Sequence, residues 1–151
     1  SVIEAGDLQY MSAGDGVQHS EFNPSDSEKT ELYQIWMRPN QKGGTPRYAE
    51  KKLSAENSIN KTKLLFSGNG QDDSIEILQN AEILFGHYQE GEKYLVAENE
   101  ILKNLWIQVI EGKINISGNY LGKADGLGIE NQTNELPLSI IEESKFLIFR
   151  L

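Results

Sequence analysis

The sequence predicts an all-β protein. Short runs that are apolar, or that alternate between polar and apolar residues, follow one another closely and are separated by turn residues. The run Lys113–Ser117 alternates cleanly, as a strand with one buried face should. Because no long amphipathic helix interrupts this pattern, a β-sandwich or β-barrel is the expected architecture.

Each expected strand is a short run of this kind between turn signals. Glycine- and asparagine-containing turns are expected at Asn69-Gly70, Glu90-Gly91, Glu111-Gly112 and Gly118-Asn119. The expected strands are Asp7–Ser12, Val17–Phe22, Glu31–Arg38, Lys63–Ser67, Ser74–Leu78, Glu82–Tyr88, Lys93–Ala97, Leu105–Ile110, Lys113–Ser117, Gly126–Glu130, Leu136–Ile141 and Lys145–Leu151.

A domain boundary is expected in the segment from Pro39 to Pro46. Its prolines and glycines form a connector that cannot lie inside a sheet. Too few strands precede this connector to close a barrel, whereas those after it are enough for a complete one. We therefore expect residues 1–42 to form a partial segment and residues 43–151 to form a complete β-barrel.

Composition and charge restrict the function. With a net charge of −9, the chain is poorly suited to bind nucleic acid or an anionic membrane surface directly. No apolar run approaches the roughly 20 residues that span a bilayer. The absence of cysteine excludes a disulfide, a thiolate nucleophile and a zinc–thiolate site, and it fits a location in the reducing cytoplasm.

The sequence His19-Ser20-Glu21 is the strongest candidate for a functional site. Residues two apart on a strand point to the same face, so an imidazole and a carboxylate would project side by side. Both groups are ligands that suit a divalent transition metal. Two ligands form only part of a metal site, and the only other histidine of the chain is His87.

Several segments resemble the pirin family of two-barrel cupins, which includes pirin-like proteins with quercetin dioxygenase activity. The most specific segments are Gly6–Gly14 and Gly16–Glu21. The resemblance continues through Leu32–Pro39, Thr45–Tyr48, Leu105–Val109 and Ala124–Ile129, and so covers most of the chain. Gly6, Gly14, His19 and Asn23 also match the second sequence motif of cupins, with Ser12 at the position of its proline.

The resemblance implies a cupin fold, a double-stranded β-helix that is similar to a jelly roll. A partial N-terminal cupin segment, residues 1–42, would pack on a complete C-terminal cupin barrel without metal ligands, residues 43–151. It also implies that His19 and Glu21 are the third and fourth ligands of Fe(II) or another divalent transition metal. In the family, a His-x-His motif upstream supplies the first two ligands, and this chain has no such motif. We therefore expect the chain to lack the N-terminal part of the first barrel and to leave the metal weakly held or unbound.

Other residues are expected to be structural. His87 fits a hydrogen-bonded structural histidine better than a ligand, and Asp72-Asp73 fits a solvated turn better than a metal cluster. The glycine-rich run Gly122–Gly128 is expected at a barrel corner, because it does not match a phosphate-binding loop. Arg38 and Arg47, which flank the connector, are expected to form salt bridges between the two parts of the chain. The aromatic residues expected to pack the cores are Trp36, Trp106, Phe146 and Phe149.

Two functions from different classes remain open. The first is a protein descended from a metal-dependent quercetin 2,3-dioxygenase, in which Glu21 would also accept a proton from a flavonol substrate. That protein would be inactive alone, because two metal ligands are missing. The second is a non-catalytic module that binds or regulates a protein partner. The open sheet edges of a partial barrel would also allow a homo-oligomer, for example a strand-exchanged homodimer.

Overall fold

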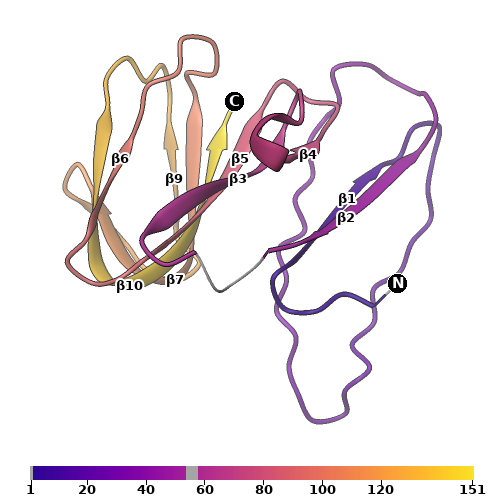
Figure 1. Cartoon of the computed structure of the whole chain (residues 1–151), viewed down its shortest axis with the longest axis horizontal. Helices are drawn as coiled ribbons and strands as arrows, with labels where there is room; N and C mark the ends of the chain where they lie inside the picture. The colour runs from indigo at the N-terminus through magenta and orange to yellow at the C-terminus, as the bar shows by residue number, and fades with distance from the viewer. Residues whose placement is uncertain (1, 54–57) are drawn as a thin grey trace.

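The computed structural model describes residues 2–53 and 58–151. In these ranges the regular elements are strands, apart from the short 3-10 helix η2 (Gln71–Asp73). Figure 1 shows most of the strands gathered into one barrel, with a two-stranded sheet beside it. The expected all-β class is therefore confirmed. Within the described ranges no helix is long and apolar enough to cross a membrane.

The strands agree closely with the expected ones after the connector. They are β1 (Asp7–Ser12), β2 (Arg47–Lys52), β3 (Lys61–Ser67), β4 (Ile75–Glu76), β5 (Glu82–Tyr88), β6 (Lys93–Val96), β7 (Leu105–Ile116), β8 (Asn119–Leu121), β9 (Gly126–Ile129) and β10 (Leu136–Arg150). The strands β2 and β8 were not expected, since each is short or lies directly after a turn signal.

The strands β3 to β10 form one eight-stranded sheet that is folded over into a barrel (Figure 1). The hydrogen-bonded order is β4-β3-β5-β10-β7-β8, with β6 also paired to β10 and β9 to β7. The long strands β7 and β10 therefore take part in both faces of the barrel. Each of them replaces two expected strands.

The expected turn at Glu111-Gly112 is wrong, because this dipeptide is a β-bulge inside β7. The register between β7 and β10 shifts around Glu142 and Lys145. Gly112 has φ of 80°, and a Cβ on it would lie 2.0 Å from the carbonyl oxygen of Glu143. Glycine thus lets the paired strands bend without losing their pairing.

Side chains from both faces of the barrel fill its interior. Phe146 is fully buried and stacks on Tyr88, with ring centroids 5.9 Å apart. This confirms the core position of Phe146. The rest of the interior cluster is Val96, Leu105, Ile107, Val109, Ile114, Ile116, Leu121, Leu138, Ile140 and Ile148.

A second apolar cluster joins the N-terminal segment to the outer face of the barrel. Leu147 and Phe149 alternate with the interior residues of β10 and point outward into this cluster, which confirms the core position of Phe149. From the N-terminal segment, Leu8, Tyr10 and Met37 pack against it. The backbone N–H of Leu78 also donates to Tyr10 Oη at 3.2 Å. The expected packing of a partial N-terminal segment on a complete barrel is therefore present.

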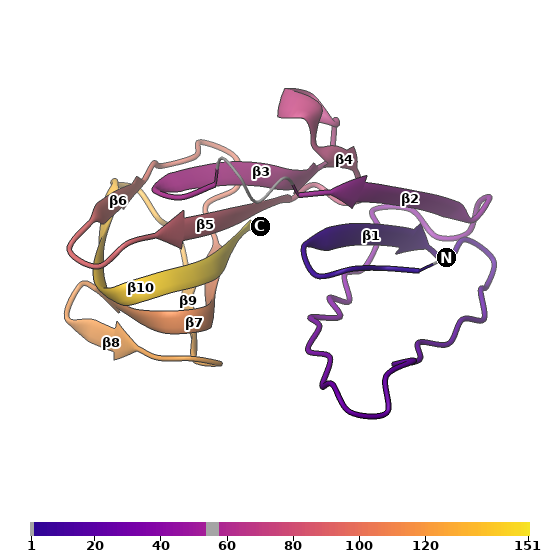
Figure 2. The same cartoon turned by 60° about the horizontal axis from the view of Figure 1, so that its bottom comes forward.

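The sheet of the N-terminal segment crosses the connector. β1 pairs antiparallel with β2, so Ser12 lies opposite Arg47. Arg47 also forms an ion pair with Glu76 of β4, at 3.6 Å, but both residues lie in the range 43–151, so this is not the salt bridge expected between the two parts of the chain. Figure 2 shows that the chain between β1 and β2 runs out as a long irregular loop. The division between residues 42 and 43 stays a prediction.

Candidate functional site

The candidate ligands lie in the long irregular segment between β1 and β2. His19 and Glu21 are exposed, and neither belongs to a strand. The expected strands Val17–Phe22 and Glu31–Arg38 are therefore wrong as regular elements. A strand needs a neighbour to take its backbone hydrogen bonds, and the described residues supply no neighbour to either segment.

Gln34 nevertheless brings the two candidate ligands together. Its side-chain nitrogen Nε2 lies 3.5 Å from His19 Nε2 and 3.4 Å from Glu21 Oε1. The imidazole and the carboxylate therefore both lie beside the Gln34 amide. The strand from which they were expected to project side by side is absent, so their role as metal ligands stays a prediction.

The segment that carries Gln34 is attached to the barrel on both sides of this residue. Before it, Glu31 pairs with Lys123 at 3.0 Å, and Tyr33 Oη donates to the carbonyl of Val109 at 3.5 Å. The hydrogen bond from Lys123 to Glu31 raises the pKa of Lys123 above its ordinary value. After it, Met37 packs into the second apolar cluster. The segment that carries Gln34 is thus attached to the barrel. The segment that carries His19 and Glu21 has no strand partner among the described residues.

Trp36 is hydrogen-bonded to Gln34, which also contacts His19 and Glu21, and it does not pack in a core. Its side chain is 84% exposed, and its indole Nε1–H donates to Gln34 Oε1 at 2.9 Å. The expectation of a core position for Trp36 is therefore wrong, because no sheet covers its segment. The core position expected for Trp106 is wrong as well, because Trp106 is 43% exposed and its ring lies over Gly126 and Gly128, outside both apolar clusters.

The side chains of His19 and Glu21 are of the types that bind a divalent transition metal, but they are only two. An imidazole nitrogen and a carboxylate oxygen are two ligands of the kind such ions take, and a facial site needs at least three. In the part of the chain that the structure describes, no group of three histidine, cysteine, aspartate or glutamate side chains could hold a metal ion. His19 and Glu21 therefore provide one side of a metal site rather than a closed one.

His87 is structural, as expected. Its Nε2 lies 2.9 Å from Glu143 Oε1, on the outer face of the barrel. Asp73 of η2 is also structural, because it pairs with Lys51. The hydrogen bond from Lys51 lowers the pKa of Asp73. Neither group contacts the His19 and Glu21 side chains.

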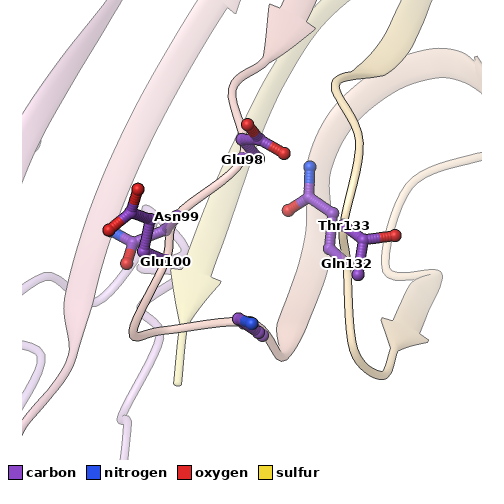
Figure 3. Close-up of a pocket in the computed structure, with 6 residues that line it drawn as sticks. Glu98, Asn99, Glu100, Gln132 and Thr133 are labelled. Atoms are coloured by element: carbon purple, nitrogen blue, oxygen red, sulfur yellow. The ribbon is translucent and has the colours of Figure 1, made fainter.

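A pocket of about 390 Å³ lies at one end of the barrel, away from the predicted site residues. Figure 3 shows Glu98, Asn99 and Glu100 on one of its walls and Gln132 and Thr133 on another. The buried Gln132 holds these loops in place, since its Nε2 donates to the carbonyls of Val96 and Asn134. None of the predicted catalytic or metal-ligating residues lines this pocket.

Sequence reasoning missed Gln34. A signal was present, because Gln34 is the only polar residue within the apolar run Leu32–Met37. A polar side chain in such a run marks the face of the segment that is not packed against apolar residues, and Gln34 is exposed. The pattern does not name its partner, and the structure identifies it as the pair His19 and Glu21.

Two regions of the chain match models of known protein families. Residues 64–151 match the model described as the quercetinase C-terminal cupin domain. Residues 1–37 match the model described as pirin. The first match alone covers more than half of the 151 residues.

Individual relatives extend the likeness over nearly the whole chain. A quercetin 2,3-dioxygenase of Escherichia coli is 34% identical over 149 residues, which are 99% of this chain and 62% of that protein. A pirin-like protein of Caulobacter vibrioides is 29% identical over 145 residues, 95% of this chain and 61% of that protein. The chain thus spans about three fifths of the length of these relatives.

Solved structures agree with these sequence matches. The crystal structure of YhhW from Escherichia coli superposes with a TM-score of 0.90 at 33% identity, over 99% of this chain and 62% of that one. A structure of the bacterial pirin YhhW in complex with nickel(II) superposes with a TM-score of 0.89 at 32% identity, with the same coverage. The two-part arrangement in Figure 1 is therefore also found in known structures.

Proposed function

The chain belongs to the pirin family of cupin proteins, and from this we propose that His19 and Glu21 are two ligands of a divalent transition metal in a protein of the quercetin 2,3-dioxygenase type. The 151 residues alone supply no His-x-His motif for further ligands. We therefore propose that these residues by themselves hold the metal weakly and do not turn over quercetin.

One observation carries the proposal most directly. Gln34 Nε2 lies within hydrogen-bond distance of both His19 Nε2 and Glu21 Oε1, so the two candidate ligand atoms lie near each other around one amide group. The nickel(II) complex of a relative that is 32% identical supports a divalent ion in this family. Fe(II) is our specific choice for the natural metal.

The residues of the site have separate roles in this proposal. His19 Nε2 and Glu21 would hold the metal, which when bound would coordinate a flavonol and make it easier to oxidise. Glu21 would also accept a proton from a hydroxyl of the flavonol, since a carboxylate beside the bound substrate is suitably placed for that task. A cytoplasmic location also belongs to the proposal.

Nickel titration of the purified 151-residue chain tests the proposal. We expect weak binding of one Ni²⁺ per chain by isothermal titration calorimetry, and no binding by His19→Ala or Glu21→Gln. His87→Ala is the matched control, because it removes the other histidine, whose partner Glu143 lies outside the site. Equal nickel binding by His19→Ala and the unmodified chain would contradict the proposal.

An oxygen-electrode assay with quercetin and Fe(II) tests the second part. We expect no oxygen uptake above that of Fe(II) and quercetin without protein. Turnover that His19→Ala abolishes would show that the chain alone is active, and our proposal on this point would be wrong.

A second candidate function is a non-catalytic module that binds a protein partner or a second copy. The observation that favours it is the exposure of large apolar side chains on the N-terminal segment, where Phe22 is 86% exposed and Trp36 84% exposed. Such residues normally mark an interaction surface when they gather on one segment. Light scattering distinguishes this candidate: a dimer that Phe22→Ser converts to a monomer would support it.

A further inference from the structure

We propose that the pocket at the end of the barrel binds a small organic cation that carries N–H groups, an alkylammonium ion, through the side-chain carbonyl of Gln132 and the carboxylates of Glu98 and Glu100. These residues line the pocket from two different loops. The site is separate from His19 and Glu21 and does not depend on the function proposed above.

The first observation is a buried amide oxygen without a partner. Gln132 is only 6% exposed, and its Nε2 donates to the carbonyls of Val96 at 3.1 Å and Asn134 at 2.9 Å. The opposite orientation of the amide would turn its oxygen toward two carbonyl oxygens, so these contacts fix the position of Oε1. Among the described residues, none donates a hydrogen bond to Gln132 Oε1. Because a buried polar atom normally has a partner, this oxygen indicates a donor from outside the chain.

The second observation is the direction of this amide. Figure 3 shows the Gln132 side chain reaching from its own wall of the pocket toward the wall that carries Glu98 and Glu100. Neither of these carboxylates takes part in an ion pair with another described residue. The pocket therefore presents an amide oxygen and two carboxylates, all of them acceptors, without a donor that the chain assigns to them.

The loop that carries the two carboxylates is held in place by its own hydrogen bonds. Asn99 Oδ1 accepts from the backbone N–H groups of Ile101 at 2.9 Å and Leu102 at 2.8 Å. Leu102 is buried and so attaches this loop to the barrel. Asn99 is thus used within the loop, whereas Glu98 and Glu100 on either side of it remain for a ligand.

The acceptors and the size of the pocket together define the class of ligand. Carboxylates and an amide oxygen bind groups that are positively charged or donate hydrogen bonds. The pocket measures about 390 Å³, whereas one water molecule occupies about 30 Å³ in the liquid. A volume of this size suits a small molecule better than a single metal ion. Because Gln132 Oε1 is buried, the group that reaches it must also be narrow, as an ammonium end is.

Lys103 adds a positive charge to the lining of the same pocket. Its ammonium group forms no ion pair with another described residue. A ligand that carries a carboxylate besides its amine would pair with Lys103, as a basic amino acid does. A polyamine has the same alkylammonium chemistry without that carboxylate, so the two sources are distinguished by experiment.

Isothermal titration calorimetry of the 151-residue chain with putrescine tests the site. We expect one putrescine to bind per chain, and the corresponding diol, which has hydroxyl groups in place of the amines, not to bind. Putrescine methylated fully at both nitrogens keeps both charges but has no N–H group, and we expect it to bind about 10-fold more weakly or less. Equal binding of the methylated and unmodified diamines would overturn the proposal, as would the absence of binding by both putrescine and ornithine at millimolar concentration.

Substitutions at exposed positions locate the binding. We expect Glu98→Gln and Glu100→Gln each to weaken putrescine binding by about 10-fold, because each removes one charged acceptor. Glu90→Gln is the matched control, since Glu90 is also exposed and does not line the pocket. Equal losses in all three variants would overturn the proposal, because attraction to the net charge of −9 would then explain the binding.

The role of Gln132 is measured without replacing it, because its amide also holds Val96 and Asn134. We expect putrescine to shift the side-chain amide signals of Gln132 in ¹H–¹⁵N NMR spectra. The side-chain amide of Gln108, which donates to the carbonyl of Asp125 away from the pocket lining, should not change. Unchanged Gln132 signals at saturating putrescine would overturn its role.

Ornithine distinguishes the two sources, because it carries the two amines of putrescine and a carboxylate. Tighter binding of ornithine that Lys103→Gln removes would support a basic amino acid, and tighter binding of putrescine would support a polyamine. Binding of Ca²⁺ that Glu98→Gln abolishes, with no binding of either amine, would overturn the proposal in favour of a metal-ion site.

Discussion

At the scale of single residues, the two histidines of the chain show how the partner of a side chain decides its role. His19 is exposed, and its Nε2 lies 3.5 Å from the side-chain nitrogen of Gln34. His87 Nε2 faces the carboxylate of Glu143, which requires a proton on that same atom. His87 is therefore tied to a charged partner on the barrel, whereas His19 meets a neutral amide.

The ion pair between Lys145 and Glu111 gives a prediction at the same scale. Lys145 Nζ donates to Glu111 Oε2 at 2.8 Å, and this hydrogen bond holds the pKa of Glu111 below its ordinary value of 4.5. We expect Lys145→Gln to return the pKa of Glu111 toward 4.5, as measured by ¹³C NMR titration of the carboxyl groups. Lys93→Gln, on β6, is the control for the loss of one positive charge.

The sign of the accompanying stability effect follows from the lowered pKa. A carboxyl group whose pKa is depressed by folding stabilises the protein fully above its unfolded pKa, and loses that contribution as the pH falls through the folded pKa. The difference in stability between the unmodified chain and Lys145→Gln should therefore be present at neutral pH and vanish in acid. A difference that persists below the folded pKa would contradict this explanation.

At the scale of elements, the bend in β7 and β10 depends on Gly112. We expect Gly112→Ala to destabilise the protein by about 1–3 kcal/mol or more in urea unfolding, because it adds backbone strain to a clash with Glu143. Gly91→Ala is the matched variant: Gly91 has a similar φ of 84°, but a Cβ there meets no atom within 4 Å. Equal losses in the two variants would show that strain alone, and not the close approach at the bulge, sets the cost.

The strands that were correctly expected share one physical reason. Glu82–Tyr88 and Asp7–Ser12 were predicted with the bounds that the structure has, because both their pattern and their neighbours favour a strand. Val17–Phe22 has a comparable pattern but no neighbour among the described residues. A pattern reports which face could be buried, whereas pairing depends on another part of the chain.

At the scale of the whole molecule, stability should differ between the two parts. The barrel has a closed interior cluster, whereas the segment between β1 and β2 has no ladder hydrogen bonds in the described structure. We expect the amides of residues 17–22 to exchange with deuterium far faster than those of β5, β7 and β10, as measured by hydrogen-exchange mass spectrometry. Comparable protection of residues 17–22 and β7 would contradict the unpaired state of this segment.

The candidate site was predictable only in part, because contacts between distant segments cannot be read from a local pattern. The spacing of His19 and Glu21 predicted that an imidazole and a carboxylate would project side by side from a strand; the strand is absent, and both side chains contact Gln34. Neither Gln34 nor Trp36 was predicted to join them, because Gln34 lies 15 residues from His19 in the sequence. Their contact depends on how the segment 31–37 docks on the barrel.

The sequence by itself determined the all-β class and the positions of most barrel strands, because these depend on local alternation and on turn residues. The tertiary structure alone decided that Glu111-Gly112 bends a continuous strand, that Trp36 is exposed, and that Gln34 joins His19 and Glu21. The physical reason is that bends, exposure and side-chain partners depend on contacts between residues far apart in the chain, and local pattern carries no information about them.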